Sequence, residues 1–298
     1  MAKRCVVIGA ANADIGARSG GPLLMRDSNP GQVRISLGGV GRNIAHNLCL
    51  LGADTGLITA LGGDAHASLL RESCSRLGIG LEGALCFPEQ SSSSYVFIAG
   101  PDGEMELAVS DMEIYDGMTP ERLAPALPRL YGADVVVLDG NLPAETITWL
   151  AARCPAPVAA DTTSAAKAPR FLNALPRLAL LKPNLLEARL LTGEESPENC
   201  ARALLRAGVG RVVISLGPNG ALAAEGAEML CLPCPETVLV NATGGGDAMT
   251  AALALTLSEP LESSLRFALA AGAMAVESGE TVNPEISKDA VLLRAGLL

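Results

Sequence analysis

The sequence predicts an α/β protein in which a central, mostly parallel sheet carries helices on both faces and a small β-lid. Short runs such as Arg4–Ile8 and Asp134–Leu138 are apolar throughout, as strands buried on both faces of a parallel sheet usually are. Helical stretches alternate with these runs, which is the order that a layered α/β fold requires. Two further segments interrupt this order, and their alternating pattern favours antiparallel strands outside the main sheet.

The expected elements follow the chain as a regular alternation of strands and helices. Strands are expected at Arg4–Ile8, Thr55–Leu61, Asp134–Leu138, Pro157–Ala160, Leu178–Leu181 and Arg211–Ser215. Helices are expected at Arg42–Leu51, Ala67–Leu77, Ala144–Arg153, Leu185–Leu191, Glu198–Ala207, Asp247–Leu257 and Leu261–Glu277. Gly52 and Gly78 follow the first two helices, where glycine readily ends a helix.

The two interrupting segments are expected to form the lid. The stretch Gly20–Ser36 is polar and ends in the alternating run Val33–Ser36. The stretch Ser94–Ser110 is typical of a hairpin, with a turn at Pro101–Gly103. We therefore expect one α/β domain over residues 1–298, with lid segments at approximately 17–37 and 84–112.

Composition excludes several classes of protein. The 298 residues include 22 Lys and Arg against 32 Asp and Glu, a net charge of −10, so a basic nucleic-acid surface is not expected. Aromatic residues make up 3%, which disfavours stacking of single-stranded bases. No apolar run is long enough for a membrane span or a secretory signal. We expect a cytoplasmic protein without nucleic-acid or membrane partners, whose 8 cysteines stay reduced.

Three familiar motif patterns do not carry the function. The chain has no G-x-x-x-x-G-K-[ST] phosphate loop. The stretch Gly78–Gly83 fits G-x-G-x-x-G by letter, but it follows a helix instead of a strand, which is the wrong context for dinucleotide binding. Cys231 and Cys234 form a single CxxC pair, too little for a zinc site.

The strongest local signal is the run Asn241–Asp247 (NATGGGD) before an expected helix. Gly244, Gly245 and Gly246 would let a ligand approach the backbone, and the helix N-terminus would supply free N–H groups for an anion. Asp247 would then lie within reach of that ligand. A simple glycine turn with Asp as the helix cap is the alternative.

Two weaker signals lie near the N-terminus. Gly38–Asn43 (GGVGRN) is a second glycine turn running into a helix. Asn12 and Asp14 lie just beyond the first expected strand, where open α/β sheets bind ligands, and a carboxylate with an amide can hold vicinal hydroxyls. Ordinary turns remain the alternative for both.

Taken in order, these motifs resemble the ribokinase-like (PfkB) carbohydrate kinase family over nearly the whole chain. The resemblance is carried by Gly38–Asn43, Lys182–Asn184 with Glu187, Ser215–Gly220 and Asn241–Asp247. It implies ATP-dependent phosphorylation of an alcohol, with Mg²⁺. Five segments most resemble the branch that phosphorylates pseudouridine: Ile8–Asp14, Asp27–Gly31, Gly38–Leu51, Ser110–Met112 and Asn241–Asp247. A kinase for another nucleoside or sugar (adenosine, inosine, ribose or fructose 6-phosphate) and a non-catalytic nucleoside-binding protein remain the alternatives.

The resemblance also implies residue roles. Asp247 would be the base, and the backbone of Gly244, Gly245, Gly246 and Asp247 the anion hole. Substrate contacts are expected from Asn12, Asp14, Ser28, Asn29, Gly39, Gly41, Asn43, Ser93, Tyr95, Asp111 and Asn141. Nucleotide contacts are expected from Asn184, Ser215, Gly217, Gly220, Asn241, Thr243 and Asn283, with Asn184 and Glu187 in the outer shell of Mg²⁺.

Two departures and two partners complete the expectations. Asn241 stands where the family usually has an Asp that helps hold a monovalent cation, so activation by K⁺ stays open. Gly245 replaces the usual Ala and permits the same backbone. Relatives often dimerise through the lid, and an exposed strand edge gives a physical motive for a homodimer. A glycosidase that cleaves the phosphorylated product is an expected pathway partner.

Overall fold

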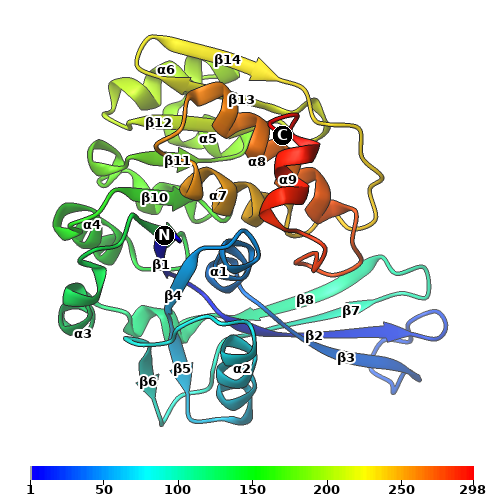
Figure 1. The fold of residues 1–298 in the computed structure, drawn as a ribbon. Coiled ribbons are helices and arrows are strands. Elements are labelled where there is room, and N and C mark those ends of the chain that lie inside the picture. The colour runs from blue at the N-terminus through cyan, green and yellow to red at the C-terminus, as the bar shows by residue number, and fades with distance from the viewer. Residues whose placement is uncertain (1) are drawn as a thin grey trace.

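The centre of the molecule is an eight-stranded sheet with the order β14-β13-β12-β11-β10-β9-β1-β4 (Figure 1). We describe it from a computed structural model, which covers residues 2–298. The parallel strands are β1 (Arg4–Ile8), β4 (Asp54–Ile58), β9 (Val135–Asp139), β10 (Val158–Asp161), β11 (Leu180–Lys182) and β12 (Arg211–Ser215). Two antiparallel strands, β13 (Ala221–Glu225) and β14 (Glu228–Leu232), extend one edge and were not predicted. The predicted mostly parallel sheet is confirmed.

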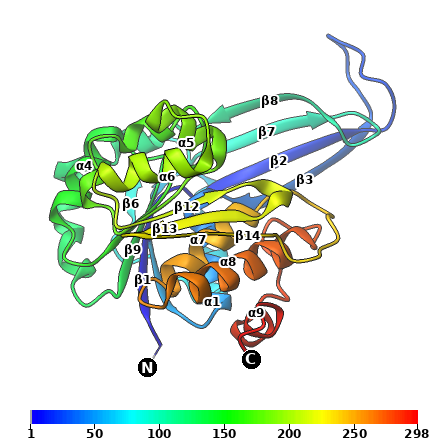
Figure 2. The same ribbon diagram turned by 90° about the horizontal axis from the view of Figure 1, so that it is seen from above.

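Helices cover both faces of this sheet, as the apolar strands require (Figure 2). One side carries α1 (Val40–Leu50), α7 (Gly245–Leu255), α8 (Leu261–Val276) and α9 (Lys288–Arg294). The other carries α3 (Pro120–Leu123), α4 (Ala144–Arg153), α5 (Leu185–Thr192) and α6 (Pro197–Arg206). In β1, Cys5 and Val7 join the core on the first side while Val6 and Ile8 join the core on the second. This period of two explains why the strand is apolar throughout.

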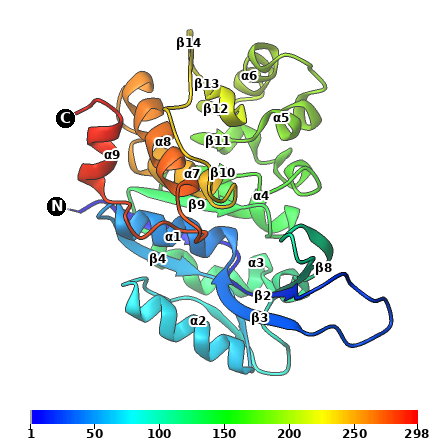
Figure 3. The ribbon, with the colours of Figure 1, turned by 90° about the vertical axis from the view of Figure 1, so that its right-hand side faces the viewer.

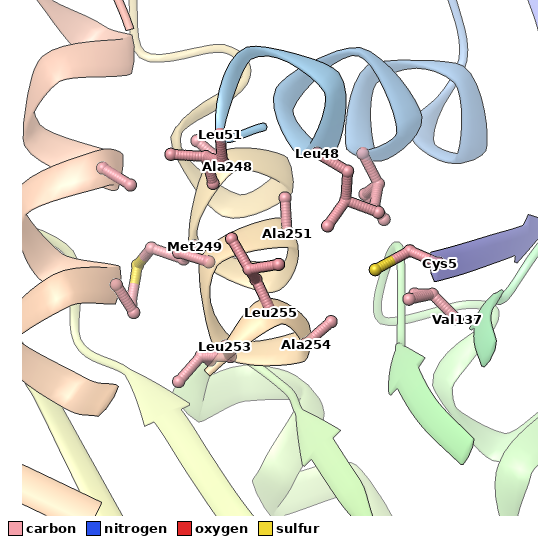
Figure 4. Close-up of a cluster of buried hydrophobic side chains, with 14 of the residues drawn as sticks. Cys5, Leu48, Leu51, Val137, Ala248, Met249, Ala251, Leu253, Ala254 and Leu255 are labelled. Carbon is pink, nitrogen blue, oxygen red and sulfur yellow. The ribbon is translucent and has the colours of Figure 1, made fainter. Parts of the chain in front are cut away.

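Helix α7 is the most enclosed helix near the predicted site. It lies between α1 and α8, with Ala248 and Ala251 among the small side chains that permit this close packing (Figure 4). Leu48 of α1 is fully buried in the same cluster. The N-terminus of α7 is therefore fixed by its neighbours.

The lid is a separate sheet with the order β3-β2-β7-β8 (Figures 1 and 3). Its strands are β2 (Asn12–Ser19), β3 (Gly31–Gly38), β7 (Ser94–Ala99) and β8 (Met105–Asp111). Beside it lie helix α2 (Ala65–Arg76) and the small pair β5 (Ala60–Gly62) and β6 (Leu85–Phe87). The lid strands extend away from the end of the main sheet opposite the N-terminus (Figure 2).

Two sequence-based boundaries were wrong. The expected single strand Thr55–Leu61 is two strands, because β4 leaves β1 after Ile58 and β5 pairs with β6 instead. Buried Thr59 separates them, and its hydroxyl lies 3.3 Å from that of Tyr115. Asn12 and Asp14 lie inside β2 and pair with β3, so they do not form a loop.

Within residues 2–298, none of the helices is long and apolar enough to cross a membrane. Each of the 8 cysteines in this range is a free thiol, including Cys231 and Cys234.

Candidate active site

The two glycine turns meet through one hydrogen bond. The side-chain amide of Asn43, in the first turns of α1, donates to Asp247 Oδ2 at 2.9 Å. The two residues are separated by 204 positions in the chain. The predicted substrate side and the predicted catalytic side therefore form one site.

The turn before α7 has the geometry of an anion site. Gly244 is the residue before the helix and has φ +91°, which only glycine adopts easily. The first intrahelical bond there runs from the Ala248 N–H to the Gly244 carbonyl at 3.0 Å. The N–H groups of residues 245–247 precede that bond, and such groups have no partner inside a helix. They can therefore bind a phosphoryl oxygen.

The turn before α1 is shaped by contact with the protein itself. Gly39 has φ +95°, and a Cβ there would lie 2.5 Å from the carbonyl oxygen of Ala10. A Cβ on Gly41 would lie 2.7 Å from the carbonyl carbon of Gly9. These approaches bring Asn43 to the end of β1. Its Oδ1 is buried and accepts no hydrogen bond within residues 2–298, so it is available to a substrate hydroxyl.

Asn12 and Asp14 occupy the root of the lid. The Asn12 amide donates to Asp14 Oδ1, and Asn12 is buried. Burial raises the pKa of Asp14 to about 6, while the Asn12 hydrogen bond and Arg42 oppose this rise. The chemistry of the pair suits vicinal hydroxyls, but neither residue lines the cavity that contains Asn43, so their contact with substrate stays a prediction.

Asp247 lies beside other carboxylates at the base of the site. Burial and the neighbouring Asp161 raise its pKa to about 8, and Asp139 adds to this effect. The hydrogen bond from Asn43 and the charge of Lys182 act in the opposite direction. Asp247 is thus a far stronger base than a solvent-exposed Asp.

A cavity of about 340 Å³ joins this turn to the nucleotide side. Ser215, Gly217 and Gly220 line it together with Gly245 and Gly246, so five predicted residues share one space. Its other walls are mostly apolar, and sequence reasoning missed them: Thr237, Leu239, Met249, Leu269, Ala273 and Val276. Such walls suit the flat face of a purine. In the sequence, the small residues at 272–273 of α8 were the signal that could have indicated this wall of the cavity.

Asn184 and Glu187 form a helix cap at the start of α5. The Asn184 side chain accepts from the Glu187 N–H, and Glu187 accepts from the Asn184 backbone and side chain. The Thr162 hydroxyl also donates to Glu187 Oε2 at 2.6 Å. Within residues 2–298 no group of three or more His, Cys, Asp and Glu could hold a metal ion. Contact of Asn184 and Glu187 with the water shell of an ion stays a prediction.

A second cavity, of about 540 Å³, opens between the lid, α1 and the loop 279–282. It contains the predicted Asn43, together with residues that sequence reasoning missed: Gly16, Arg34, Ser36, Arg42, His46, Phe97 and Glu280. Burial and Arg42 lower the pKa of His46 to about 4, so it is neutral here. No cationic cluster is evident near the motifs in the sequence, yet the fold brings two arginines to this cavity.

Phe97 and His46 had usable sequence signals. Phe97 lies two residues from Tyr95 on the same strand face, and His46 follows Asn43 by one helical turn. A Cβ on Gly16 would lie 2.5 Å from the Phe97 ring, so glycine there lets the ring lie against the lid backbone.

Several predicted lid residues lie elsewhere. Ser28 is exposed and Asn29 half-buried in the loop after β2, and the Asn29 side chain bonds to the backbone of Leu24. Asp111 pairs with Ser94, the residue before Tyr95, so Asp111 and Tyr95 lie on opposite faces of the lid sheet. Tyr95 donates to the sulfur of Met105, and neither cavity is lined by it.

The remaining predicted residues are already engaged within the protein. The hydroxyl of Ser93 donates to the Ala11 carbonyl, and Lys167 donates to the Asn141 side chain. Asn241 Oδ1 accepts from the Thr243 N–H at 3.0 Å, and Ala242 between them lines the nucleotide cavity. Asn283 is buried and donates to the Met274 carbonyl at 2.7 Å, so its expected position beside adenine stays a prediction.

Comparison with known proteins covers nearly the whole chain. Residues 2–288 match the model described as pfkB family carbohydrate kinase. The chain is 35% identical over 291 residues to the pseudouridine kinase of Escherichia coli K12, covering 95% of this chain and 93% of that protein. It is 34% identical over 297 residues to the uncharacterized sugar kinase YeiI of the same strain, covering 97% and 82%. The 1-phosphofructokinase of Rhodobacter capsulatus is 32% identical over 258 residues, covering 80% and 78%.

Solved structures give the same picture of the fold. A carbohydrate kinase from Agrobacterium tumefaciens superposes with a TM-score of 0.90 at 31% identity, covering 99% of this chain and 98% of that one. The ribokinase of Arabidopsis thaliana, complexed with ribose and ATP, superposes with a TM-score of 0.86 at 25% identity, covering 99% of each chain. The predicted ribokinase-like fold is confirmed.

Proposed function

This chain belongs to the pfkB family of carbohydrate kinases, and from that premise we propose that it phosphorylates the 5′-hydroxyl of pseudouridine with ATP. The family makes it a sugar or nucleoside kinase. One observation carries the proposal for the site: the Asn43–Asp247 hydrogen bond joins a hydroxyl-binding turn to an anion-binding turn. The choice of pseudouridine is supported by the similarity to the pseudouridine kinase of Escherichia coli.

In the proposed reaction, the 5′-oxygen attacks the γ-phosphorus of ATP and ADP leaves. The proton of the hydroxyl passes to Asp247, whose raised pKa of about 8 suits proton acceptance near neutral pH. Phosphoryl transfer is mainly positioning and charge stabilisation, so the proton can move late. The N–H groups of Gly245, Gly246 and Asp247 would stabilise charge on the transferred group.

Asn12, Asp14 and Asn43 would hold the ribose. The free Oδ1 of Asn43 accepts from one hydroxyl while its amide stays on Asp247. ATP would occupy the cavity lined by Ser215, Gly217 and Gly220. Mg²⁺ would neutralise phosphate charge, with Asn184 and Glu187 contacting its water shell.

The nucleobase would occupy the cavity beneath the lid. The Phe97 ring, set against Gly16, offers a surface for stacking. Ser36 and Glu280 line the same space, and their oxygens can accept the additional N–H that pseudouridine has over uridine. A site that pairs with this group discriminates strongly against an analogue that lacks it.

A second candidate is a kinase for a phosphorylated sugar. Arg34 and Arg42 line the cavity, and cationic side chains there would suit a phosphate. The Arg42 guanidinium already donates to the Leu37 carbonyl and the Ser73 hydroxyl, each at 2.7 Å. Two of its donors are therefore engaged, whereas its Nε has no partner within residues 2–298, so the choice of the nucleoside is supported by the similarity to the pseudouridine kinase.

A substrate panel tests these alternatives. ADP formation is measured with ATP, Mg²⁺ and either pseudouridine, uridine, adenosine, inosine, ribose or fructose 1-phosphate, with and without K⁺. We expect the highest kcat/KM for pseudouridine. A higher value for another compound would overturn the substrate assignment. Turnover of none of them, or equal turnover by the Asp247→Asn variant, would favour a non-catalytic binding protein.

The partner proposals have separate support. The outer face of the lid exposes Val33, Ile35, Leu107 and Val109, an apolar surface that a second copy of the chain would cover. We therefore propose a homodimer through the lid, which light scattering at micromolar concentration tests directly. A monomeric mass would contradict it. The glycosidase that would consume the product, the cytoplasmic location and the division into one domain with a lid stay predictions.

A further inference from the structure

Lys182 is a buried cation at the site that the proposed reaction has not used. It ends β11 and is 5% exposed. Its Nζ lies 3.3 Å from Asp161 Oδ2. It also lies 3.5 Å from the position that a Cβ on Gly246 would take, which places the ammonium beside the first turn of α7.

The surroundings of Lys182 are rich in negative charge. Asp139 of β9 and Asp161 of β10 are buried, and Asp247 of α7 is close enough to both for their charges to act on it. Asp139 accepts from the N–H groups of Ala10 and Asn141, and Asp161 accepts from the Thr250 hydroxyl. Buried carboxylates repel one another unless a cation compensates them.

The charged groups that act on Asp247 can be assigned to their elements. Asp161 from β10 and Asp139 from β9 disfavour its ionised form, and Lys182 from β11 favours it. The contact from α1 is the neutral amide of Asn43. Among these groups of the described chain, Lys182 alone brings positive charge to Asp247.

We propose that Lys182 is a positioning residue for phosphoryl transfer: its ammonium, held between Asp161 and the turn at Gly246, favours the ionised form of Asp247 that accepts the substrate proton. The inference rests on the proposed function in giving Asp247 the role of base. A purely structural role, in which the ion pair only ties β10 to β11, would leave the titration of Asp247 unchanged.

The first arm of the test needs no enzymatic activity. The free energy of unfolding of the whole protein is measured between pH 5 and pH 10 for two pairs. The first pair is the natural protein and Asp247→Asn. The second pair is Lys182→Met and Lys182→Met/Asp247→Asn. The difference between each pair grows with pH until Asp247 is ionised in the folded state, and then levels off. We call the pH at which this difference becomes constant the levelling point, and we expect Lys182→Met to raise it by about one pH unit or more. An unchanged levelling point would overturn the proposal.

The second arm follows kcat against pH with pseudouridine, or with the best substrate of the panel. Lys182→Met should move the acidic limb to higher pH and lower kcat at pH 7 by about tenfold for each pH unit that the limb moves, with recovery at high pH. Lys182→Arg keeps the charge and should restore most of the loss. A loss independent of pH would overturn the proposal. If no substrate is turned over, the proposed function fails while the first arm still decides the role of Lys182.

Two further variants distinguish an effect on the titration of Asp247 from a general folding defect. Lys182→Met/Asp161→Asn removes the ion pair without leaving a lone charge, and it should return the levelling point toward that of the natural protein, since Asp161 and Lys182 act on Asp247 in opposite directions. Arg211→Met is the matched control. Arg211 is also buried and ion-paired, to Glu225 at 2.7 Å, but it begins the neighbouring strand β12 instead of ending it. It should lower stability without moving the titration of Asp247.

Discussion

The two glycine turns precede helices in the same way, yet they differ in what fills the space beside them. At the turn before α1, a Cβ on Gly39 would meet the Ala10 carbonyl at 2.5 Å, and one on Gly38 would overlap the Asp14 carboxylate. At the turn before α7, Gly246 has its nearest such neighbour in Lys182, at 3.5 Å. The first turn is packed against protein atoms throughout. The second is packed at Gly244, where a Cβ would overlap the Thr281 carbonyl oxygen, but Gly245 and Gly246 line a cavity.

This difference separates two uses of glycine that look alike in a sequence. The N-terminal turn uses glycine so that β1, the lid and α1 can approach one another and present the Asn43 side chain. The C-terminal turn uses Gly244 in the same packed way, against Thr281, but uses Gly245 and Gly246 so that a ligand can approach backbone N–H groups. Substitutions should therefore reduce stability at the first turn, whereas substitution of Gly246 in the second should reduce activity.

The largest expected effect is that of Asp247→Asn. We expect kcat to fall by roughly 10²–10⁴, the range for loss of a general base. Stability should change in the opposite direction. The pKa of Asp247 in the folded state, about 8, lies above its ordinary value of 3.8, so the natural protein loses stability as pH rises between these values. The variant should therefore match it near pH 4 and exceed it above pH 8, as urea unfolding at each pH would measure.

A variant that loses stability equally at all pH values would contradict this prediction. The Asn43 hydrogen bond provides the internal control, because an Asn at 247 can still accept from it.

Gly39→Ala should have the next largest effect. It forces a side chain into φ +95° and against the Ala10 carbonyl, so we expect a loss of about 2–4 kcal/mol in the free energy of unfolding. Urea denaturation measures this loss. Gly52→Ala is a useful control, since Gly52 shares the positive φ at +85° but has open space around it, and it should lose less.

Gly246→Ala should have the smallest effect on stability. Its helical position accepts a methyl group, so we expect a change within about 1 kcal/mol. The methyl would instead narrow the cavity, and KM for ATP should rise by roughly tenfold, or about 1.4 kcal/mol. Steady-state kinetics at saturating nucleoside gives KM. If Gly246→Ala proves less stable than Gly39→Ala, the contrast between the turns is wrong.

Much of the fold could be predicted because its signals are local. The apolar runs of β1, β9 and β12 are buried on both faces, so a short window of sequence identifies them. β2 was missed because Asp14, Gly16 and Arg18 lack the β-branched residues on which such a prediction depends. β13 and β14 were missed because alanine and glutamate are poor strand formers, and their place is set by pairing with β12.

The sequence predicts the parts of the site that depend on local backbone structure better than the parts where side chains from distant elements line one cavity. Glycine turns and the Asn184–Glu187 cap have fixed spacing, so they show in the sequence. Phe97 and His46 reach one cavity from a lid strand and from α1, and Glu280 reaches it from the loop after α8. Only the fold brings these residues together. Ser28 and Asn29 failed to reach it for the same reason, since polarity alone does not say where a loop will extend.

The connection between the lid and the site has a mechanical consequence. Asn12 begins β2 and pairs with Gly38, which ends β3, and Gly39 follows at once as the residue before α1. Both roots of the lid hairpin are thus clamped at the residues proposed to hold the sugar, with no spacer between them. A shift of Asn12 or Gly38 therefore also shifts the first residue of β2 or the last residue of β3.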